Sequence, residues 1–346
     1  MANITIAIDC MGGDFGPSVT VPAVKVLLEN NSYQTVNFKL FGQQDLIRAQ
    51  LEFLKILNHP RLVVLASDED VLMTDKPSIA LKTKKRSSMR LALESVRDGR
   101  SHACVSGGNT GALMAISRFV LRMLPGIDRP AIIAAIPTYN KKQVYLLDLG
   151  ANVECRESRL AQFAIMGNEL SKSIDGIESP RVGLLNVGTE EYKGSEKIQK
   201  AAELIKVLDG INYLGFVEGN QIFSGDFDVI VTDGFTGNNV LKASEGLSYF
   251  LMTKIKEAFN RNWWTKLIGL LAKPIITVFK EEIDPERYNG ACLIGLRGIV
   301  IKSHGGANVK ASAWAIEEAI VQAKTRVPTR IRESLQKANK GLTDSA

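Results

Sequence analysis

The stretch ACVSGGNTGALM, residues 103–114, passes from an apolar run through a glycine-rich turn into a second apolar segment. The change comes directly after Val105, where Ser106, Gly107 and Gly108 follow strand-like residues. α/β proteins are built from buried strands that pass through such turns into helices. The first N–H groups of the helix have no partner within it, so they can bind an anion. The stretch therefore predicts an α/β fold with a phosphate or carboxylate site at the turn.

The same alternation of strand-like and helix-like segments continues along all 346 residues. Short aliphatic and β-branched runs predict strands at 4–9, 36–41, 61–66, 102–106, 131–136, 143–149, 181–187, 212–217, 228–233 and 297–302. Apolar residues at three- and four-residue spacing predict helices at 78–97, 109–123, 157–175, 195–208, 238–260 and 308–337. Strands that are apolar throughout are typical of a mostly parallel sheet covered by helices on both faces. The runs 131–136 and 143–149 are close enough to form a hairpin, so we expect a mixed sheet.

The composition indicates a globular protein of a reducing compartment. Hydrophobic residues make up 45% of the chain and no Pro/Gly/Ser-rich linker divides it, so we expect one domain over residues 1–346. The four cysteines form no CxxC pair, and three of them, Cys10, Cys104 and Cys292, lie in or beside apolar runs and are expected to be buried thiols. The N-terminus enters a strand at once and lacks the pattern of a signal peptide, which predicts a cytoplasmic location.

Several function classes lack their usual sequence signals. A net charge of +6 is too small to indicate nucleic-acid binding. The three histidines and four cysteines show no metal-ligand spacing, so no metal is expected. Ser106 occupies the place of the first glycine in a dinucleotide fingerprint, and residues 188–194 have the wrong spacing for a P-loop. No GxSxG nucleophile motif is present either.

Six predicted strands end in glycine together with small polar residues. These loops are DCMGGD (9–14), SGGNTG (106–111), DLGAN (148–152), NVGT (186–189), TDGFTGN (232–238) and SHGGAN (303–308). Ligands of open α/β sheets bind at the carboxyl ends of the strands, so we expect the six loops to line one cleft. Glycine also serves tight turns, which is the alternative for any single loop. The acids Asp9, Asp148 and Asp233 could bind Mg²⁺ but are expected to accept hydrogen bonds from loop N–H groups.

Such a cleft offers main-chain donors, amides and hydroxyls, with Lys193 as its lysine. It suits a substrate that is itself the nucleophile, and inorganic phosphate is already anionic at neutral pH. Phosphate therefore needs positioning more than activation. If it is held near a thioester it can attack the carbonyl, while a cation and an amide donor stabilise the oxyanion. The residues permit this reaction without requiring it.

Taken in order, the loops resemble those of the bacterial phosphate acyltransferase family, PlsX. The resembling motifs are AIDCMGGDFGP (7–17), KKRSSMRLA (84–92), VSGGNTGALM (105–114), GIDRPA (126–131), LLDLGANVEC (146–155), SPRVGLLNVGTEEYKGSE (179–196), DVIVTDGFTGN (228–238) and YNGACLIGLRGIVIKSHG (288–305). The resemblance implies transfer of a long-chain acyl group from acyl carrier protein to inorganic phosphate, which gives an acyl phosphate for phospholipid synthesis. It also implies a homodimer with the fold of phosphotransacetylases and isopropylmalate dehydrogenases, a three-layer α/β/α sandwich around a mostly parallel mixed sheet. No metal or nucleotide cofactor is implied.

The resemblance also assigns roles to single residues. Lys193 and Asn238 are the candidates for polarising the thioester carbonyl or binding phosphate. Ser106, Gly108, Asn109 and Thr110 are expected to form the phosphate-binding start of a helix. Asp9, Asn152, Thr189, Asp233, Thr236 and His304 are expected to line or brace the cleft, although a purely structural turn is the alternative for each bracing residue.

Two surface features suggest partners. The residues Lys82, Lys84, Lys85, Arg86 and Arg90 form a basic cluster without an intervening acid. It is either an ordinary solvated surface or a docking site for the acidic acyl carrier protein. Residues 260–282 form an amphipathic segment in which Trp263, Trp264, Leu267 and Leu271 alternate with lysines, and Pro274 is expected to interrupt or kink the helix.

The amphipathic segment has two interpretations that do not exclude each other. It can be buried in a dimer interface, or it can lie at a membrane surface with tryptophan and lysine at the level of the headgroups. Membrane contact would suit a lipid-like product that is consumed by a membrane glycerol-3-phosphate acyltransferase.

Three other functions remain open from the sequence. A short-chain phosphotransacetylase that uses acyl-coenzyme A is the main alternative. An NAD-dependent decarboxylating dehydrogenase of the same fold would need a metal site. A lipid-surface scaffold would leave the six polar glycine loops without a purpose.

Overall fold

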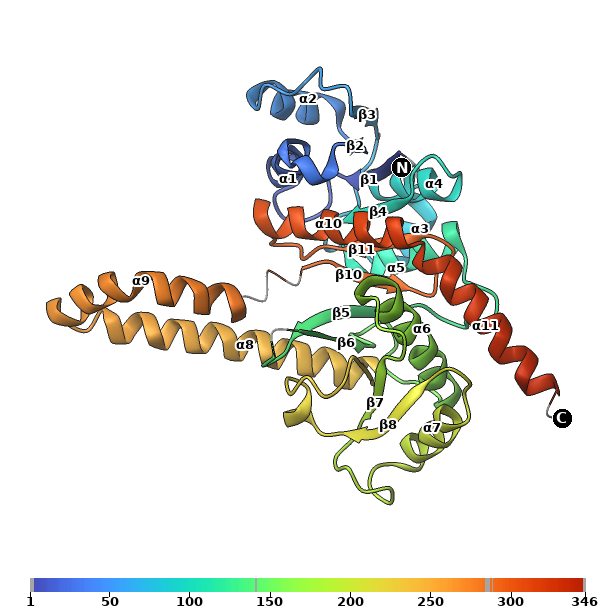
Figure 1. Cartoon of the computed structure of the whole chain (residues 1–346). Coiled ribbons are helices and arrows are strands. Elements are labelled where there is room, and N and C mark those ends of the chain that lie inside the picture. The colour runs from blue at the N-terminus through green and yellow to red at the C-terminus, as the bar shows by residue number, and fades with distance from the viewer. Residues whose placement is uncertain (1–2, 141, 284–286, 288, 345–346) are drawn as a thin grey trace.

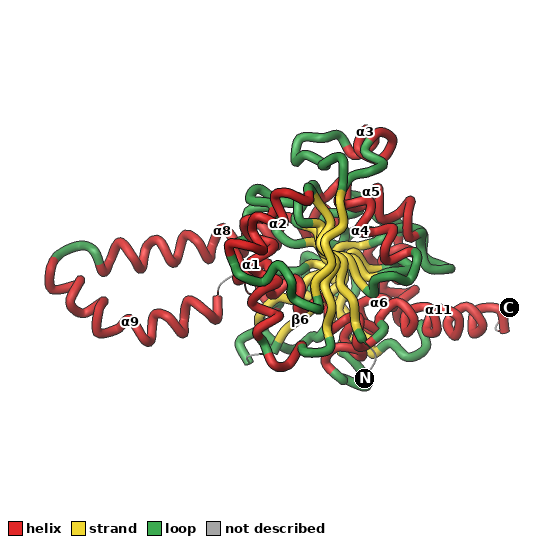
Figure 2. Tube along the Cα trace, turned by 90° about the horizontal axis from the view of Figure 1, so that it is seen from above, coloured by secondary structure: helices red, strands yellow, loops and turns green. Residues whose placement is uncertain are grey.

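The computed structural model describes residues 3–140, 142–283, 287 and 289–344 and contains one eleven-stranded sheet with the order β3-β2-β1-β4-β11-β10-β5-β6-β9-β7-β8. Helices lie on both sides of the strands (Figure 2), which confirms the predicted α/β/α layers. The strands are β1 (Ile4–Asp9), β2 (Val36–Gly42), β3 (Leu62–Ala66), β4 (Ala103–Ser106), β5 (Ala131–Pro137), β6 (Gln143–Leu147), β7 (Arg181–Leu185), β8 (Asn212–Val217), β9 (Val229–Val231), β10 (Ala291–Ile294) and β11 (Ile299–Lys302). The helices are α1 (Pro17–Glu29), α2 (Gln44–Phe53), α3 (Pro77–Thr83), α4 (Ser88–Arg97), α5 (Thr110–Leu121), α6 (Glu157–Asp175), α7 (Glu196–Lys206), α8 (Gly234–Phe259), α9 (Trp263–Ile283), α10 (Val309–Thr325) and α11 (Val327–Asp344).

The sheet consists of two parallel groups that run in opposite directions. Strands β3, β2, β1, β4 and β11 are parallel to one another, and β6, β9, β7 and β8 form the second parallel group. Between the groups, β10 pairs antiparallel with both β11 and β5, and β5 pairs antiparallel with β6. The hairpin expected from residues 131–149 is therefore present as β5–β6. It reverses the strand direction for the rest of the sheet.

An apolar layer covers each face of the sheet because alternate side chains of a strand point to opposite faces. On β1, Ile6 and Ile8 belong to the layer beneath α1, α2 and α10, whereas Ala7 belongs to the opposite layer beneath α4 and α5. All four cysteines are free and buried, which confirms the expectation for Cys10, Cys104 and Cys292. The buried apolar layers fix which strand ends face outward.

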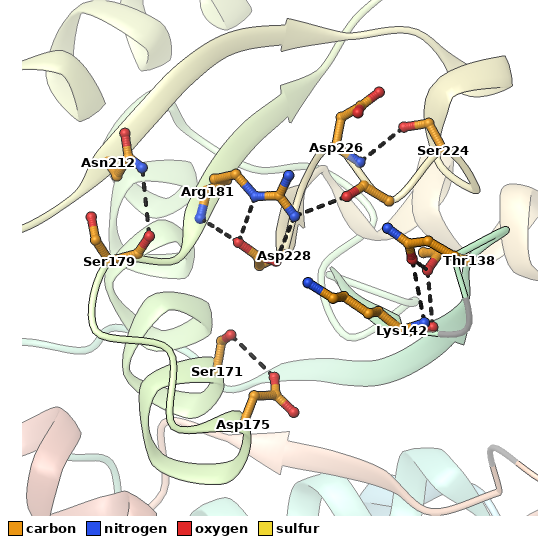
Figure 3. Close-up of polar contacts among 12 residues, drawn as sticks. Thr138, Lys142, Ser171, Asp175, Ser179, Arg181, Asn212, Ser224, Asp226 and Asp228 are labelled. Atoms are coloured by element: carbon orange, nitrogen blue, oxygen red, sulfur yellow. Dashed lines mark hydrogen bonds and ion pairs between the residues drawn. The ribbon is translucent and has the colours of Figure 1, made fainter.

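A polar clamp holds the amino ends of β7 and β9 together (Figure 3). The Arg181 guanidinium donates to both carboxylate oxygens of Asp228, each at 2.9 Å, and to the Gly225 carbonyl. Burial alone would raise the pKa of Asp228, but the hydrogen bonds from Arg181 outweigh it and hold that pKa below its usual range. The charges of Arg181 and Asp228 neutralise each other, so this cluster has a structural role.

The structure corrects several sequence-based element boundaries. The predicted helix 78–97 is two helices, α3 and α4, and the predicted helix 308–337 is divided at Arg326, which has φ of 53°. Pro328 then occupies the first turn of α11, where a missing N–H costs nothing. Pro274 lies inside α9 and does not end it. The short strand β10 and the helices α1 and α2 were not predicted.

Helices α8 and α9 form an arm that projects from the body (Figure 1). Within the arm α9 packs against α8 and otherwise exposes apolar side chains. Trp263 and Trp264 are 65% and 59% exposed and stack on each other, with ring centroids 3.8 Å apart. None of the helices in the described part of the chain combines the length and hydropathy that a membrane span requires.

Candidate functional site

The six glycine loops lie on two opposite edges of the sheet, so the prediction that they line one cleft of the chain is wrong. The loops after β1, β4 and β11 lie at the carboxyl edge of the first parallel group, which we name edge A. The loops after β6, β9 and β7 lie at the carboxyl edge of the second group, which we name edge B. The cause is the reversal of strand direction at β10 and at the β5–β6 hairpin.

Edge A is organised around the buried carboxylate of Asp9 at the end of β1. Its oxygens accept hydrogen bonds from the hydroxyls of Ser88 and Ser106, each at 2.6 Å. Burial raises the pKa of Asp9, and the hydrogen bonds from the two serines partly oppose this rise. The expected bracing role of Asp9 fits this geometry, because its oxygens hold the loop after β4 and the start of α4 in place.

Most polar side chains of the predicted phosphate loop after β4 form hydrogen bonds within the protein. The Ser106 hydroxyl also accepts from the Gly108 N–H at 3.1 Å. Asn109 caps α5 by accepting from the Ala112 N–H at 3.0 Å, while its NH₂ group donates to Met73 and Asp75 carbonyls. Thr110 is exposed, and no side-chain hydrogen bond to it is formed within the described residues. A ligand here would therefore meet main-chain N–H groups and the Thr110 hydroxyl rather than the Ser106 or Asn109 side chain.

Close glycine packing leaves little internal space at edge A. A Cβ atom on Gly12 would lie 2.7 Å from both an Asp9 oxygen and the Gly108 nitrogen, so only glycine fits there. The cavity between the loops has a volume of about 20 Å³, enough for roughly one water molecule. An anion at this edge must therefore bind on the outer surface of the loops.

Lys302 is a residue at edge A that the sequence reasoning missed. Its ammonium group donates to the Gly107 carbonyl at 3.1 Å and to the Ser303 carbonyl, and the residue is only 9% exposed. Burial lowers the pKa of Lys302 to about 8, against the opposing effect of the nearby charges of Asp9 and Asp14. A lysine at the end of an apolar strand, directly before a glycine loop, was the available signal. His304 follows it and is exposed, with Nδ1 accepting from the Gly306 N–H.

Edge B begins with Asp148, which is fully buried after β6. Its carboxylate accepts from the N–H groups of Ile132, Ala151 and Asn152 and from the Asn152 side chain, at 2.6 to 3.1 Å. Burial raises the pKa of Asp148, and these hydrogen bonds oppose the rise. Asn152 also donates to the Pro130 carbonyl at 2.8 Å, so it braces the loop as expected.

The first turn of α8 lies beside this loop. Asp233 caps the helix by accepting from the Thr236 N–H at 2.9 Å, and Lys197 lies 3.4 Å from its other oxygen. Asn238 is half-buried, and in the described part of the chain its amide has no hydrogen-bond partner. A Cβ on Gly150 would lie 3.5 to 3.6 Å from the Asn238 side chain. The free amide of Asn238 is thus held beside the Asp148 loop, while the Thr236 side chain faces solvent.

Lys193 lies in the loop after β7 on the same edge. The Asn186 side chain clamps this loop by donating to the carbonyls of Gly188 and Lys193 at 3.1 and 3.0 Å. The Lys193 ammonium lies 2.8 Å from Glu190, whose hydrogen bond raises the pKa of Lys193. Thr189 is exposed and forms no side-chain hydrogen bond within the described residues. Edge B therefore carries two lysines, Lys193 and Lys197, and the unpartnered amide of Asn238.

The basic cluster is partly neutralised by neighbouring acids. Arg86 pairs with Asp68, and Arg90 pairs with Glu94 at 3.1 Å. Lys82 and Lys85 remain exposed and Lys84 is half-exposed. Across the described ranges, no group of three His, Cys, Asp or Glu side chains is placed to hold a metal ion.

Comparison with known proteins gives a full-length match. The family model described as "Fatty acid synthesis protein" matches residues 4–330. The phosphate acyltransferase of Coxiella burnetii (strain CbuG_Q212) is 52% identical over 332 residues, which is 96% of each chain. The phosphate acyltransferase of Alcanivorax borkumensis is 48% identical over 97% of this chain and 98% of its own, and that of Legionella pneumophila (strain Paris) is 47% identical over 99% of each.

Solved structures with low sequence identity share the fold. A phosphotransacetylase from Streptococcus pyogenes superimposes with a TM-score of 0.65 at 16% identity, covering 93% of this chain and 94% of its own. A branched-chain phosphotransacylase from Enterococcus faecalis V583 gives a TM-score of 0.58 at 13% identity, covering 92% and 99%. Both confirm the predicted fold type.

Proposed function

Because the chain belongs to the phosphate acyltransferase family and is an acyltransferase, we propose that it transfers a long-chain fatty acyl group from acyl carrier protein to inorganic phosphate. The product would be an acyl phosphate that serves phospholipid synthesis. The observation that carries the proposal is the match to phosphate acyltransferases along nearly the whole chain.

The chemistry needs one nucleophilic substitution at the thioester carbonyl. A phosphate oxygen bonds to the carbonyl carbon, the C–S bond breaks, and the carrier thiolate takes up a proton. Lys193 and Asn238 are suited to stabilise the intermediate oxyanion, since one supplies a cation and the other a half-buried amide without a partner. No residue has to deprotonate the nucleophile, because phosphate is already an anion.

The best binding site for phosphate is at edge A, where the start of α5 offers main-chain N–H groups and the Thr110 hydroxyl as hydrogen-bond donors. Edge A and edge B lie at opposite edges of one sheet. A homodimer in which edge A of one subunit faces edge B of the other would unite the two halves of the site. This arrangement is part of the proposal.

The arm formed by α8 and α9 supports a peripheral position at the cytoplasmic membrane surface. Its exposed Trp263, Trp264, Leu267 and Leu271 can enter the headgroup region, and lysines of the arm can bind anionic lipid. Such contact would place the acyl phosphate near a membrane glycerol-3-phosphate acyltransferase that consumes it.

The reaction is tested by phosphate-dependent release of carrier protein from palmitoyl-carrier protein, with Lys193→Ala compared with the wild type. Loss of an oxyanion partner should lower kcat by about 10²–10³-fold. Lys200→Ala is the matched control, because Lys200 is an exposed lysine of α7 that pairs only with Glu196. A Lys193→Ala rate equal to that of the control would reject the role of Lys193. Faster turnover of acetyl-coenzyme A than of palmitoyl-carrier protein by the wild type would favour the short-chain alternative.

A further inference from the structure

A basic depression on the outer side of α3, α4 and α5 is lined by none of the glycine-loop residues and has no role in the chemistry above. A groove of about 930 Å³ runs between α3, α4, α5 and the turn before β11. Four arginines line it, namely Arg97, Arg118, Arg122 and Arg297, and no acidic residue does. We name it the arginine groove. Its floor is apolar and includes Leu81, Val96 and Leu121.

Two of the four arginines form no polar side-chain contact with the described residues. Arg118 lies in the last turn of α5, and Arg122 follows the end of the helix with φ of 62°. Both are exposed and form no ion pair or side-chain hydrogen bond with any described residue. Arg97 is already paired with Asp98 at 2.8 Å. Arg297 lines the groove and is held by a hydrogen bond from its Nε to the Met123 carbonyl at 3.1 Å.

An exposed aromatic ring lies beside these cations. Phe119 is 61% exposed and lines the groove between Arg118 and Arg122 along α5. The Arg90 guanidinium lies over its ring at 5.3 Å and also donates to the Leu81 carbonyl. Arg90 belongs to the basic cluster, so the arginine groove continues that cluster across the outer surface of α4 and α5.

The end of α5, beside the groove, is linked to edge B by main-chain contacts. The Leu124 N–H donates to the Gly295 carbonyl, Ile294 pairs with Ala131, and the next N–H, that of Ile132, donates to Asp148. These three contacts connect the end of α5 with the Asp148 loop, which lies beside Asn238. A partner that binds the groove would therefore lie toward the same edge of the sheet as the Asp148 loop and Asn238.

We propose that the arginine groove is a docking surface for an acidic protein, which under the proposed function is the acyl-loaded carrier. Unpaired guanidinium groups around an apolar floor with one exposed aromatic are typical of protein interfaces, where arginine and aromatic residues are enriched. Guanidinium groups also bind carboxylates of a partner in paired hydrogen bonds. The identity of the partner rests on the proposed function, whereas the location of the docking surface does not.

The test compares Arg118→Glu/Arg122→Glu with the wild type, using octanoyl-carrier protein and the uncharged thioester octanoyl-N-acetylcysteamine as donors. The KM for the carrier donor should rise about tenfold or more with kcat within about twofold, because reversed charges repel an acidic partner before chemistry begins. The rate with the uncharged donor should not change. The wild-type KM for the carrier should rise with salt, and this dependence should weaken in the variant.

The matched control is Arg48→Glu/Arg330→Glu, which reverses two exposed charges on α2 and α11. The neutral variant Arg118→Gln/Arg122→Gln should give an intermediate KM. A carrier KM for Arg118→Glu/Arg122→Glu equal to that of the control overturns the docking proposal and leaves the proposed reaction intact. Turnover of the uncharged thioester without any turnover of the carrier donor by the wild type would reject the carrier as donor, and the docking proposal with it.

Discussion

Among single residues, Asn238 and Asn239 offer a direct comparison because they are neighbours in sequence with different surroundings. Asn239 donates to the Phe235 carbonyl on the exposed side of α8, whereas Asn238 is half-buried and its amide is free. We expect Asn238→Ala to lower kcat by about 10²-fold, since it removes an oxyanion donor. Asn239→Ala should stay within about twofold of the wild type. Steady-state rates with palmitoyl-carrier protein measure both, and equal losses would show that the two amides act only through helix structure.

Lys302 leads to a prediction about pH and stability. Its pKa is about 8 in the folded chain and near 10.5 when unfolded, so between these values the unfolded state binds more protons. Stability from this group therefore rises with pH through that window, by about 1 kcal/mol per pH unit. Lys302→Met removes the titration.

Urea unfolding at pH 7.5, 8.5 and 9.5 provides the measurement for Lys302. The unfolding free energy of the wild type minus that of Lys302→Met should grow more positive across the series. Taking the difference cancels the titration of tyrosines and cysteines, which both proteins share. A difference that stays constant would mean that Lys302 has an ordinary pKa in the folded protein.

The roles of the strand-end acids could be predicted from the sequence better than the burial of Lys302. Asp9, Asp148 and Asp233 were expected to hold loop N–H groups, and the structure confirms this for Asp148 and Asp233, because a short acid at a strand end has few other partners within reach. Asp9 accepts mainly from the hydroxyls of Ser88 and Ser106, together with the main-chain N–H of Met11 in its own loop. The burial of Lys302 depends on three loops that are distant in sequence, so no local pattern could reveal it.

Among the elements, the α8–α9 arm carries the prediction about lipid. Trp263→Ser/Trp264→Ser should lower binding to vesicles of anionic phospholipid by about tenfold or more, since two exposed indoles supply much of the apolar surface at the tip. Vesicle flotation measures the bound fraction. The control Phe53→Ser/Val207→Ser removes apolar side chains that are 80% and 70% exposed on α2 and after α7. If both variants float as well as the wild type, the arm does not contact lipid.

The strand elements show which part of the fold was predictable. Most strands and helices were predicted within a few residues, because buried strands are continuously apolar and helices repeat every three to four residues. The β5–β6 hairpin was predicted too, but the prediction of one cleft did not include the reversal of strand direction that the hairpin causes. The reversal places the carboxyl ends of β6, β7 and β9 at the other edge, whereas β11 is parallel to the first group and ends at edge A. Strand β10, with its four residues, was too short to stand out.

For the whole molecule, the two edges predict how mixed dimers behave. Lys193→Ala disables edge B, and Thr110→Glu places a negative charge where phosphate should bind while remaining compatible with the first turn of α5. If each site combines edge A of one subunit with edge B of the other, a mixed dimer has one intact site. Because random exchange makes half the dimers mixed, activity should recover to about a quarter of the wild type.

The mixed-dimer experiment unfolds and refolds the two inactive variants together and compares them with each variant refolded alone. Gel filtration first establishes that the wild type is a dimer. Activity of the mixture that does not exceed the sum of the separate variants would place a complete site within each chain. A wild type that remains monomeric would contradict the proposed assembly itself.

The position of β10 and β11 affects how the chain folds during its synthesis. These strands come late in the sequence but lie at the centre of the sheet, between β4 and β5. Until the ribosome has released them, the two halves of the nascent protein each present an unpaired apolar strand to their surroundings. A messenger truncated ahead of codon 291 should therefore yield insoluble fragments, and the growing chain is expected to depend on chaperones until residues 291–302 have been added.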